Sequence, residues 1–231
     1  MPVYRLIKEP VFPDPEEATP EGLLAVGGDL SPKRLIAAYA NGIFPWYAEG
    51  EPIMWWSLDP RMVLFPNDFK RHKSLRRVVS KGVFRVTFDK DFDTVIDWCG
   101  KLRATGADGT WITKDMKKAF GALHRLGLAH SVEVWQNGII AGGLYGVSLG
   151  GTFFGESMFH LVRDASKVAL WHLVDRLLEW DFDMIDAQQA TVHLAGLGAK
   201  SIPRKKFLTL LRKSLEKPIR RGDWGNYQKD N

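Results

Sequence analysis

The stretch SVEVWQNGIIAGGLYGVSLGGTFFGESMF, residues 131–159, contains three apolar runs separated by two turn signals. Asn137-Gly138 is the stronger signal, because both central positions of a two-residue hairpin turn adopt positive φ and favour these residues. Gly150-Gly151 supplies the second turn. The pattern predicts a β-meander with strands over residues 131–135, 139–149 and 152–159.

Helical and strand patterns flank the meander on both sides in the sequence. Thr113 and Asp164 are N-cap residues, the first before a helix that Gly127 ends and the second before a long amphipathic helix. Further helices are predicted over residues 73–80, 91–102, from about 191, and over 203–215. Further strands are predicted over residues 61–65, 84–88 and 182–186. An α+β domain over residues 61–231 follows from this order of elements.

The first part of the chain has a different texture. Residues 10–32 are rich in proline, glycine and acidic side chains, and we expect ordered loops and turns there. Ser31 and the following proline start a short helix that Gly42 ends. We predict a small N-terminal domain over residues 1–60, and a partly disordered tail over residues 217–231.

Composition excludes several classes of function. The 231 residues carry a formal net charge of +5, which permits a polyanionic partner without requiring one. The single cysteine, Cys99, excludes a disulfide framework and a cysteine-based zinc cage. The histidines show no metal-ligand spacing, and no P-loop, dinucleotide-binding fingerprint or Gly-x-Ser-x-Gly elbow is present, so we expect no metal. Without an apolar leader or a membrane-length apolar run, a cytoplasmic protein is expected.

Three polar residues near strand ends are candidates for chemistry. By alternation, Asp186 and Gln188 share one face of a short apolar strand, where a carboxylate and an amide can position and deprotonate a nucleophile. Glu156 lies among aromatic and methionine side chains, as a paired functional acid or as a surface acid. A helix N-cap at Asp186 and a sheet-closing ion pair at Glu156 are the structural alternatives.

Tryptophans in turn-rich loops and basic clusters form a second group. Trp46 and Trp111 can act as flat platforms for a nucleobase, or they can fill a seam between domains. The basic clusters suit nucleic-acid phosphates, although a solvated face is the ordinary outcome. They comprise Arg76 and Arg77, then Lys114, Lys117 and Lys118, and a third group at residues 200–206.

Short motifs follow one another along the chain. They are GLLAVGGDL (22–30), GIFPW (42–46), WWSLDP (55–60), GTWIT (109–113), HSVEVW (130–135), GGLYG (142–146), GESMF (155–159), ASK (165–167), IDAQ (185–188), LGA (197–199) and IPR (202–204). Together they resemble, in collinear order over residues 10–210, the bacterial leucyl/phenylalanyl-tRNA–protein transferases. The resemblance implies a small N-terminal domain plus a GNAT-type acyltransferase domain with a mixed, largely antiparallel sheet flanked by helices.

The resemblance also implies an activity. Members of this family move Leu or Phe, and less well Met, from aminoacyl-tRNA to the α-amine of a protein that begins with Arg or Lys. The product is degraded through the N-end rule pathway. The tRNA ester is itself the activated donor, so no cofactor is expected, and we expect a monomer.

On this resemblance each candidate residue receives a role. Asp186 is the base or orienter of the amine, with Gln188 as its hydrogen-bonding partner. Glu156 holds the acceptor's amine or basic side chain. Trp46 and Trp111 sandwich the terminal adenine of the tRNA, with Tyr39 nearby.

The resemblance likewise implies two larger sets of binding residues. The donor side chain is expected in a pocket lined by Leu144, Phe153, Met158, Leu170, Leu173 and Ile185. Position 144 is Leu where Met is common in the family, so the pocket differs slightly in shape there. The tRNA backbone is expected on Arg76, Arg77, Lys114, Lys117 and Lys118.

Two other functions compete with this assignment. A coenzyme-A-dependent N-acetyltransferase on the same fold needs a glycine-containing phosphate loop between a strand and a helix. The corresponding link, residues 160–167, has no glycine, which disfavours that chemistry. A non-catalytic tRNA-binding module would use the tryptophans and basic clusters, but it leaves Asp186, Gln188 and Glu156 without a role.

Overall fold

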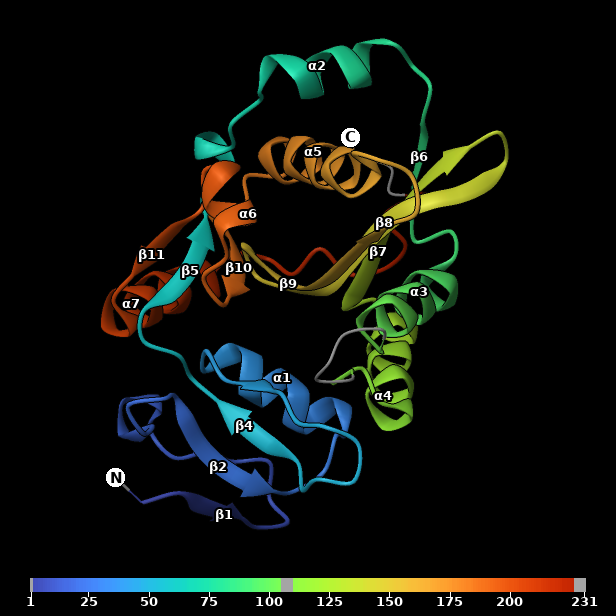
Figure 1. Ribbon diagram of the computed structural model, residues 1–231. Helices are drawn as coiled ribbons and strands as arrows, with labels where there is room; N and C mark the ends of the chain where they lie inside the picture. Colours follow the sequence, from blue (N-terminus) through green and yellow to red (C-terminus); the bar gives the residue numbers. More distant parts are fainter. Residues whose placement is uncertain (1, 105–109, 227–231) are drawn as a thin grey trace.

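The computed structural model describes residues 2–104 and 110–226, which form two β-sheets with helices around them (Figure 1). The four-stranded sheet has the order β1-β2-β4-β3, and the seven-stranded sheet the order β11-β5-β10-β9-β8-β7-β6. The strands of the small sheet are β1 (Tyr4–Leu6), β2 (Leu23–Gly27), β3 (Phe44–Pro45) and β4 (Met54–Trp56). The predicted fold class, α+β with a small N-terminal sheet, is confirmed.

The predicted meander forms the centre of the large sheet. Its strands are β7 (Ala129–Gln136), β8 (Ile139–Leu149) and β9 (Thr152–His160), paired antiparallel in sequence order. Asn137 and Gly138 have φ of 52° and 78°, as the hairpin signal requires. The prediction of three strands joined by two tight turns is therefore confirmed.

Four further strands extend the meander on both sides. They are β5 (Arg61–Leu64), β6 (Arg85–Phe88), β10 (Met184–Gln188) and β11 (Lys200–Ile202). All neighbouring pairs are antiparallel except β9 with β10, which are parallel. The expected mixed, largely antiparallel sheet is confirmed, and its one parallel pair is the place where the cavity described below opens.

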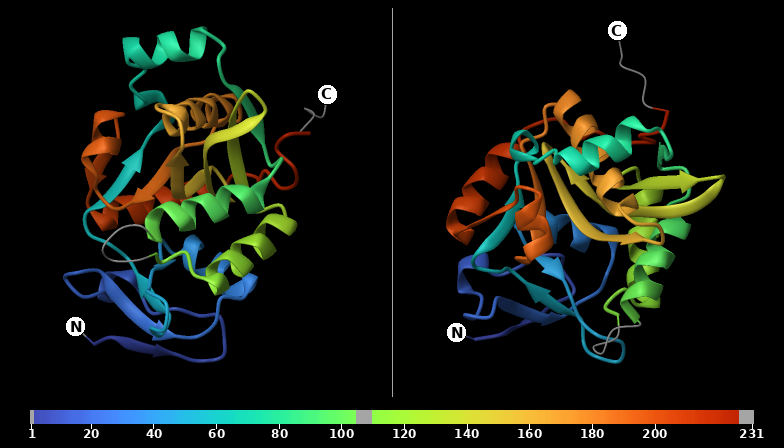
Figure 2. Two further views of the ribbon diagram at one scale, coloured as in Figure 1. Left: turned by 45° about the vertical axis from the view of Figure 1, so that its right-hand side comes forward. Right: turned by 45° about the horizontal axis from the view of Figure 1, so that its top comes forward.

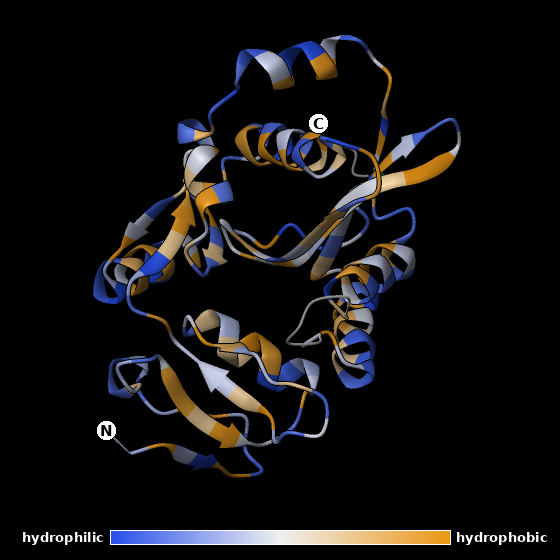
Figure 3. Ribbon diagram, viewed as in Figure 1, coloured by the Kyte–Doolittle hydropathy of each residue, from blue (hydrophilic) through white to orange (hydrophobic). Residues whose placement is uncertain are grey.

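Helices cover both faces of the large sheet (Figures 1 and 2). One face packs against α5 (Ala165–Glu179), with α2 (Lys73–Ser80) beyond it, and the other against α3 (Phe92–Ala104) and α4 (Lys114–Arg125). In Figure 3, helix α5 alternates between hydrophobic and hydrophilic positions, as expected for a helix that buries one face against the sheet. The remaining helical elements are α1 (Pro32–Ala40), α6 (Val192–Gly196), α7 (Arg204–Ser214), η1 (Pro15–Glu17) and η2 (Pro66–Asp68).

The two predicted N-caps differ in the structure. The Thr113 hydroxyl accepts a hydrogen bond from the Met116 amide at 3.2 Å, so this cap is confirmed. Asp164 immediately precedes α5, but its side chain makes no capping hydrogen bond and instead pairs with Lys167 Nζ at 2.9 Å. Asp164 therefore occupies the predicted N-cap position of α5, with a φ of 67°, but without the side-chain hydrogen bond of a capping residue.

The N-terminal part contains more regular structure than the sequence indicated. Residues 10–32 were expected to be loops and turns, yet Leu23–Gly27 forms β2, the inner strand between β1 and β4. Buried side chains of this part, such as Tyr39, pack in one continuous core with Phe120 of α4 and Phe207 of α7. The division at residue 60 stays a prediction.

The C-terminal segment is also more ordered than expected in its described part. Residues 227–231 of the predicted disordered tail lie outside the described residues. Within residues 217–226, however, Trp224 is completely buried and belongs to the core on the α5 face. Of the helices in the described ranges, none has the length and apolarity that crossing a membrane demands.

Candidate active site

The cavity of interest opens where β9 and β10 separate. The two strands pair from Met184 opposite Thr152 to Asp186 opposite Phe154, after which β9 continues to His160 while β10 ends at Gln188. A cavity of about 360 Å³ lies at this point. Pairing ends there because the backbone of β10 turns away, which leaves room beside the open edge of β9 for a ligand.

A bulge in β9 places Glu156 in the cavity. Opposite β8, Ser157 pairs with Tyr145 and Gly155 with Gly146, so Glu156 is the extra residue between them. A bulge reverses the alternation of side chains, and here Phe154 and Met158 consequently lie on opposite faces of the sheet. Glu156, the bulged residue, lines the cavity. Without the bulge, Phe154 and Met158 would lie on the same face of the sheet.

A second irregularity orients Asp186 and Gln188. The register of β10 against β5 shifts between these two residues, and Gln188 has a φ of 52°. Asp186 is fully buried and accepts two hydrogen bonds from Arg61, at 2.8 and 2.7 Å, in a bidentate ion pair. Its Oδ1 also accepts a hydrogen bond from the backbone amide of Gln188 at 3.0 Å. Asp186 therefore fixes the turn that aims Gln188, but it does not itself line the cavity.

Arg61 is the buried partner that the sequence did not reveal. Its guanidinium lies 4.9 Å from the ring centroid of Phe44 and 4.7 Å from that of Phe207, and its side chain is fully buried. Neither Asp186 nor Arg61 contacts solvent, and removing one partner of such a pair leaves an uncompensated buried charge. The predicted N-cap alternative for Asp186 is excluded by these contacts.

Polar side chains surround the Glu156 carboxyl. Its Oε1 accepts a hydrogen bond from the Tyr39 hydroxyl at 2.8 Å and a longer one from Gln188 Nε2 at 3.4 Å. Burial, followed by the negative charge of Asp186, raises the pKa of Glu156 to about 8, against the lowering effects of the Tyr39 hydrogen bond and of Arg61. A carboxyl with such a pKa exchanges protons near neutral pH.

The apolar wall of the cavity matches the predicted pocket. All six residues expected to surround a donor side chain line the cavity, together with Leu64: Leu144, Phe153, Met158, Leu170, Leu173 and Ile185. They come from β8, β9, β10 and α5, so the pocket lies between the sheet and that helix. Whether they hold a donor side chain stays a prediction.

The three aromatic residues predicted to bind adenosine lie in two different environments. Trp46 and Trp111 both line the cavity, and Trp46 is 37% exposed. Gly109 of the motif around Trp111 lies outside the described residues. Tyr39 is fully buried and outside the lining, with its hydroxyl on Glu156 and its ring 5.0 Å from Phe154. Its contact is thus with the carboxyl and not with the space between the tryptophans.

The predicted basic residues lie on two separate surfaces. Arg76 and Arg77 are exposed on α2, and Lys114 and Lys118 are exposed on α4. Figure 1 shows α2 beyond α5 on one face of the large sheet and α4 on the other face. Lys117 is half-buried and its Nζ donates to Asp97 at 2.6 Å. The two clusters cannot form one continuous patch.

Other residues of the lining were missed by the sequence reasoning. Arg103 of α3 reaches the cavity, where its Nε donates to the Ser157 hydroxyl at 3.0 Å and its guanidinium lies 5.9 Å from the Trp111 ring. Thr191 and His193 line the cavity from the start of α6. No periodicity marks such residues, since they converge from distant elements. Within the ranges 2–104 and 110–226, no group of three or more His, Cys, Asp or Glu side chains could hold a metal ion.

Comparison with known proteins decides the family. Residues 63–212 match the family model described as leucyl/phenylalanyl-tRNA protein transferase, and residues 28–59 match the model of the N-terminal domain of that protein. The chain belongs to the leucyl/phenylalanyl-tRNA–protein transferase family. The family resemblance inferred from the motifs is confirmed, and with it the assignment as an aminoacyltransferase enzyme.

Relatives of this transferase match along nearly the whole chain. A leucyl/phenylalanyl-tRNA–protein transferase of Anaeromyxobacter sp. (strain Fw109-5) is 54% identical over 97% of this chain and 95% of its own length. One of Syntrophobacter fumaroxidans is 54% identical over 97% of this chain and 96% of its own length. Among solved structures, a ribosomal-protein-alanine N-acetyltransferase of Brucella melitensis biovar Abortus 2308 is 13% identical, with a TM-score of 0.37, over 63% of this chain and 97% of its own.

Proposed function

We propose that this transferase moves a leucyl or phenylalanyl group, and less well a methionyl group, from aminoacyl-tRNA to the α-amine of a protein that begins with Arg or Lys. The observation that supports this most directly is the composition of one cavity. An apolar pocket, a raised-pKa carboxyl at Glu156 and the tryptophans Trp46 and Trp111 all line it. These three features are complementary, in that order, to an apolar acyl group, a cationic peptide end and a nucleobase.

The donor is assigned to the apolar side of the cavity. Its side chain enters between α5 and the sheet, where Leu144, Leu170 and Phe153 form apolar walls. Such walls distinguish similar side chains only weakly, since one methylene is worth about 10–200-fold in selectivity. Leu, Phe and Met are therefore all acceptable. The terminal adenine is assigned to Trp46 and Trp111, since stacking on aromatic rings tolerates any base.

The acceptor is assigned to the acidic side. A positively charged Arg or Lys side chain beside Glu156 stabilises the ionised carboxyl, so binding lowers the pKa of that carboxyl from its raised value. The carboxyl then gives up its proton as the cationic acceptor arrives. An acceptor that begins with Asp would instead place a like charge beside the carboxyl.

The reaction itself is the aminolysis of an ester. The neutral α-amine, with an ordinary pKa of about 7.7–8.0, attacks the ester carbonyl. A C–N bond forms, the C–O bond to the ribose breaks, and the amine proton ends on the released ribose hydroxyl. In this proposal Glu156 and Gln188, which both line the cavity, hold the amine and mediate that proton transfer. The product carries a new N-terminal Leu or Phe, which marks it for N-end rule degradation.

Asp186 acts as a positioning residue in this proposal. Its two oxygens are occupied by Arg61 and by the Gln188 amide, so it is not free to take a proton from the amine. Tyr39 has the corresponding part for Glu156, which it holds by one hydrogen bond. These assignments replace the base role of Asp186 and the adenosine contact of Tyr39 that the family resemblance implied.

The test is transfer of labelled leucine from leucyl-tRNA to three peptides that differ only in an N-terminal Arg, Lys or Asp. We expect transfer to the first two and very little to the third. Glu156→Gln should reduce this selectivity, whereas Glu133→Gln, a matched change of a buried carboxyl outside the cavity, should preserve it. Absence of transfer, or equal transfer to the Asp peptide, would refute the proposal.

The coenzyme-A alternative loses further support from the structure. The link between β9 and α5 spans residues 161–164 and contains no glycine. A side chain is therefore present at every position where a phosphate-binding loop needs close backbone approach. A non-catalytic RNA-binding module would leave the raised pKa of Glu156 without a use.

A further inference from the structure

The C-terminal segment returns to the α5 face of the large sheet. After α7, the chain crosses to Gly127, whose carbonyl accepts from the Gly222 amide at 3.2 Å. A Cβ at Gly127 would lie 2.3 Å from that Gly222 nitrogen, so the two backbones approach too closely for a side chain at position 127. The segment then inserts Trp224, with 0% of its surface exposed, into the core on the α5 face.

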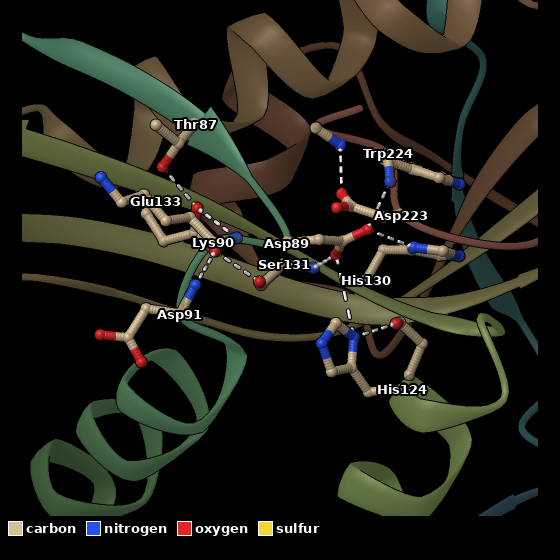
Figure 4. Close-up of polar contacts among 12 residues, drawn as sticks. Thr87, Asp89, Lys90, Asp91, His124, His130, Ser131, Glu133, Asp223 and Trp224 are labelled. Carbon is tan, nitrogen blue, oxygen red and sulfur yellow. Dashed lines mark hydrogen bonds and ion pairs between the residues drawn. The ribbon is translucent and has the colours of Figure 1, made fainter. Parts of the chain in front are cut away.

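Several contacts fix the Trp224 indole and backbone. Asp89 accepts hydrogen bonds at 2.8 Å from both the Trp224 amide and His130 Nδ1, as Figure 4 shows. Arg176 of α5 donates to the Trp224 carbonyl at 2.8 Å. The indole stacks on the His130 ring with centroids 3.9 Å apart and an interplanar angle of 12°. Its orientation is therefore determined by β7, by α5 and by the turn after β6.

Trp224 also contacts a wall of the cavity. Its ring centroid lies 5.8 Å from that of Phe153, which lines the cavity. Phe153 also lies against β8, because a Cβ at Gly146 would be only 2.5 Å from a carbon of its ring. The Phe153 ring thus cannot move toward the β8 backbone at Gly146, and the Trp224 indole is a neighbour of the same ring.

We propose that Trp224 is a positioning residue that sets the donor specificity of the transferase by fixing Phe153, one wall of the donor pocket. This inference rests on the proposed function and adds a determinant that lies outside the cavity. A smaller side chain at position 224 leaves a space behind Phe153, and the ring relaxes into it. The pocket becomes deeper, which favours the larger phenylalanyl group over the leucyl group.

The test measures kcat/KM for phenylalanyl-tRNA and for leucyl-tRNA with one peptide that begins with Arg. Trp224→Leu should raise the phenylalanyl-to-leucyl ratio about tenfold, the lower end of what one methylene of pocket space changes. Trp224→Phe, a milder change, should raise it less. Leu24→Ala, a cavity-forming change in the small sheet, serves as the control and should leave the ratio unchanged.

A double variant shows whether the effect passes through Phe153. In a Phe153→Leu background, Trp224→Leu should change the ratio less than about twofold, because the ring that transmits the effect is gone. An unchanged or lowered ratio in the Trp224 variants, or an undiminished effect in the double variant, would overturn the inference alone. If Trp224→Leu fails to fold, Trp224→Phe decides. A wild-type chain that transfers neither amino acid would overturn the proposed function and this inference with it.

Discussion

The most informative single perturbation is Glu156→Gln, which removes a titrating group and keeps its shape. The pKa of the Glu156 carboxyl is raised to about 8 from an ordinary 4.5, first by burial and then by the charge of Asp186. Gln retains an oxygen that can accept the hydrogen bond from Tyr39. The substitution therefore isolates the electrostatic contribution of one carboxyl.

The sign of the effect on stability follows from proton binding. Between pH 4.5 and about 8, the folded chain keeps the Glu156 proton and the unfolded chain releases it. The unfolded state then binds fewer protons, so the free energy of unfolding falls as the pH rises through this window. Each pH unit is worth about 1.4 kcal/mol at most, and the whole window roughly 3–5 kcal/mol. Partial exposure to the cavity places the expected value at the lower end.

The assay is denaturant unfolding of both proteins at a series of pH values from 5 to 9. The difference in the free energy of unfolding between Glu156→Gln and the wild type should grow by about 3 kcal/mol from the acid to the alkaline end. Other titrating groups, including the buried Glu133 and His130, are common to both proteins and cancel. Parallel pH profiles would show that Glu156 titrates normally and would refute the reasoning.

Three further predictions concern the neighbouring groups. Arg61→Met should lower the free energy of unfolding by about 3–5 kcal/mol, because it leaves Asp186 charged and buried. Adding Asp186→Asn should restore part of this loss in denaturant unfolding. A double variant no more stable than Arg61→Met would contradict the importance of the ion pair. Trp111→Ala should raise KM for the donor tRNA by roughly 5–150-fold without changing KM for the acceptor, as measured by steady-state kinetics. An equal change in both KM values would refute the stacking role of Trp111. Replacing Arg76 and Arg77 by Ala should reduce the slope of log affinity for tRNA against log salt by about 1 per phosphate lost, and an unaltered slope would remove α2 from the tRNA surface.

Local signals in the sequence were sufficient for most elements of the fold. Asn137-Gly138 specified the hairpin between β7 and β8, because few other residues adopt positive φ at both positions. Thr113 specified the start of α4, because its hydroxyl accepts a hydrogen bond from the backbone amide three residues further along the chain. By contrast, β2 could not be predicted, since Leu23–Gly27 is stabilised by pairing with β1 and β4 and not by its own pattern.

The site was predictable in its residues but not in their arrangement. Alternation assigns side chains to faces only where the register is continuous. The orientations of Glu156 and Gln188 both depend on register shifts against neighbouring strands. Arg61 gave no signal, because a basic residue at the start of an apolar strand is ordinarily an exposed end. Trp224 was assigned to a disordered tail since its partners His130 and Asp89 are more than ninety residues away in sequence.

The position of the cavity along β9 explains how an apolar pocket can measure a donor. Phe153 lies where β9 and β10 still pair, and Glu156 lies three residues further on, where they have separated. At about 3.3 Å per residue the two are at most about 10 Å apart along the strand, because the bulge at Glu156 shortens the path. In the proposed function, a donor held with its carbonyl beside Glu156 fits its side chain into the space between these two residues. Short side chains leave an empty space at Phe153, and longer ones push the carbonyl away from the amine. In this proposal donor selection depends on how firmly Phe153 is held, and its contact with Trp224 is the feature that the kinetic test addresses.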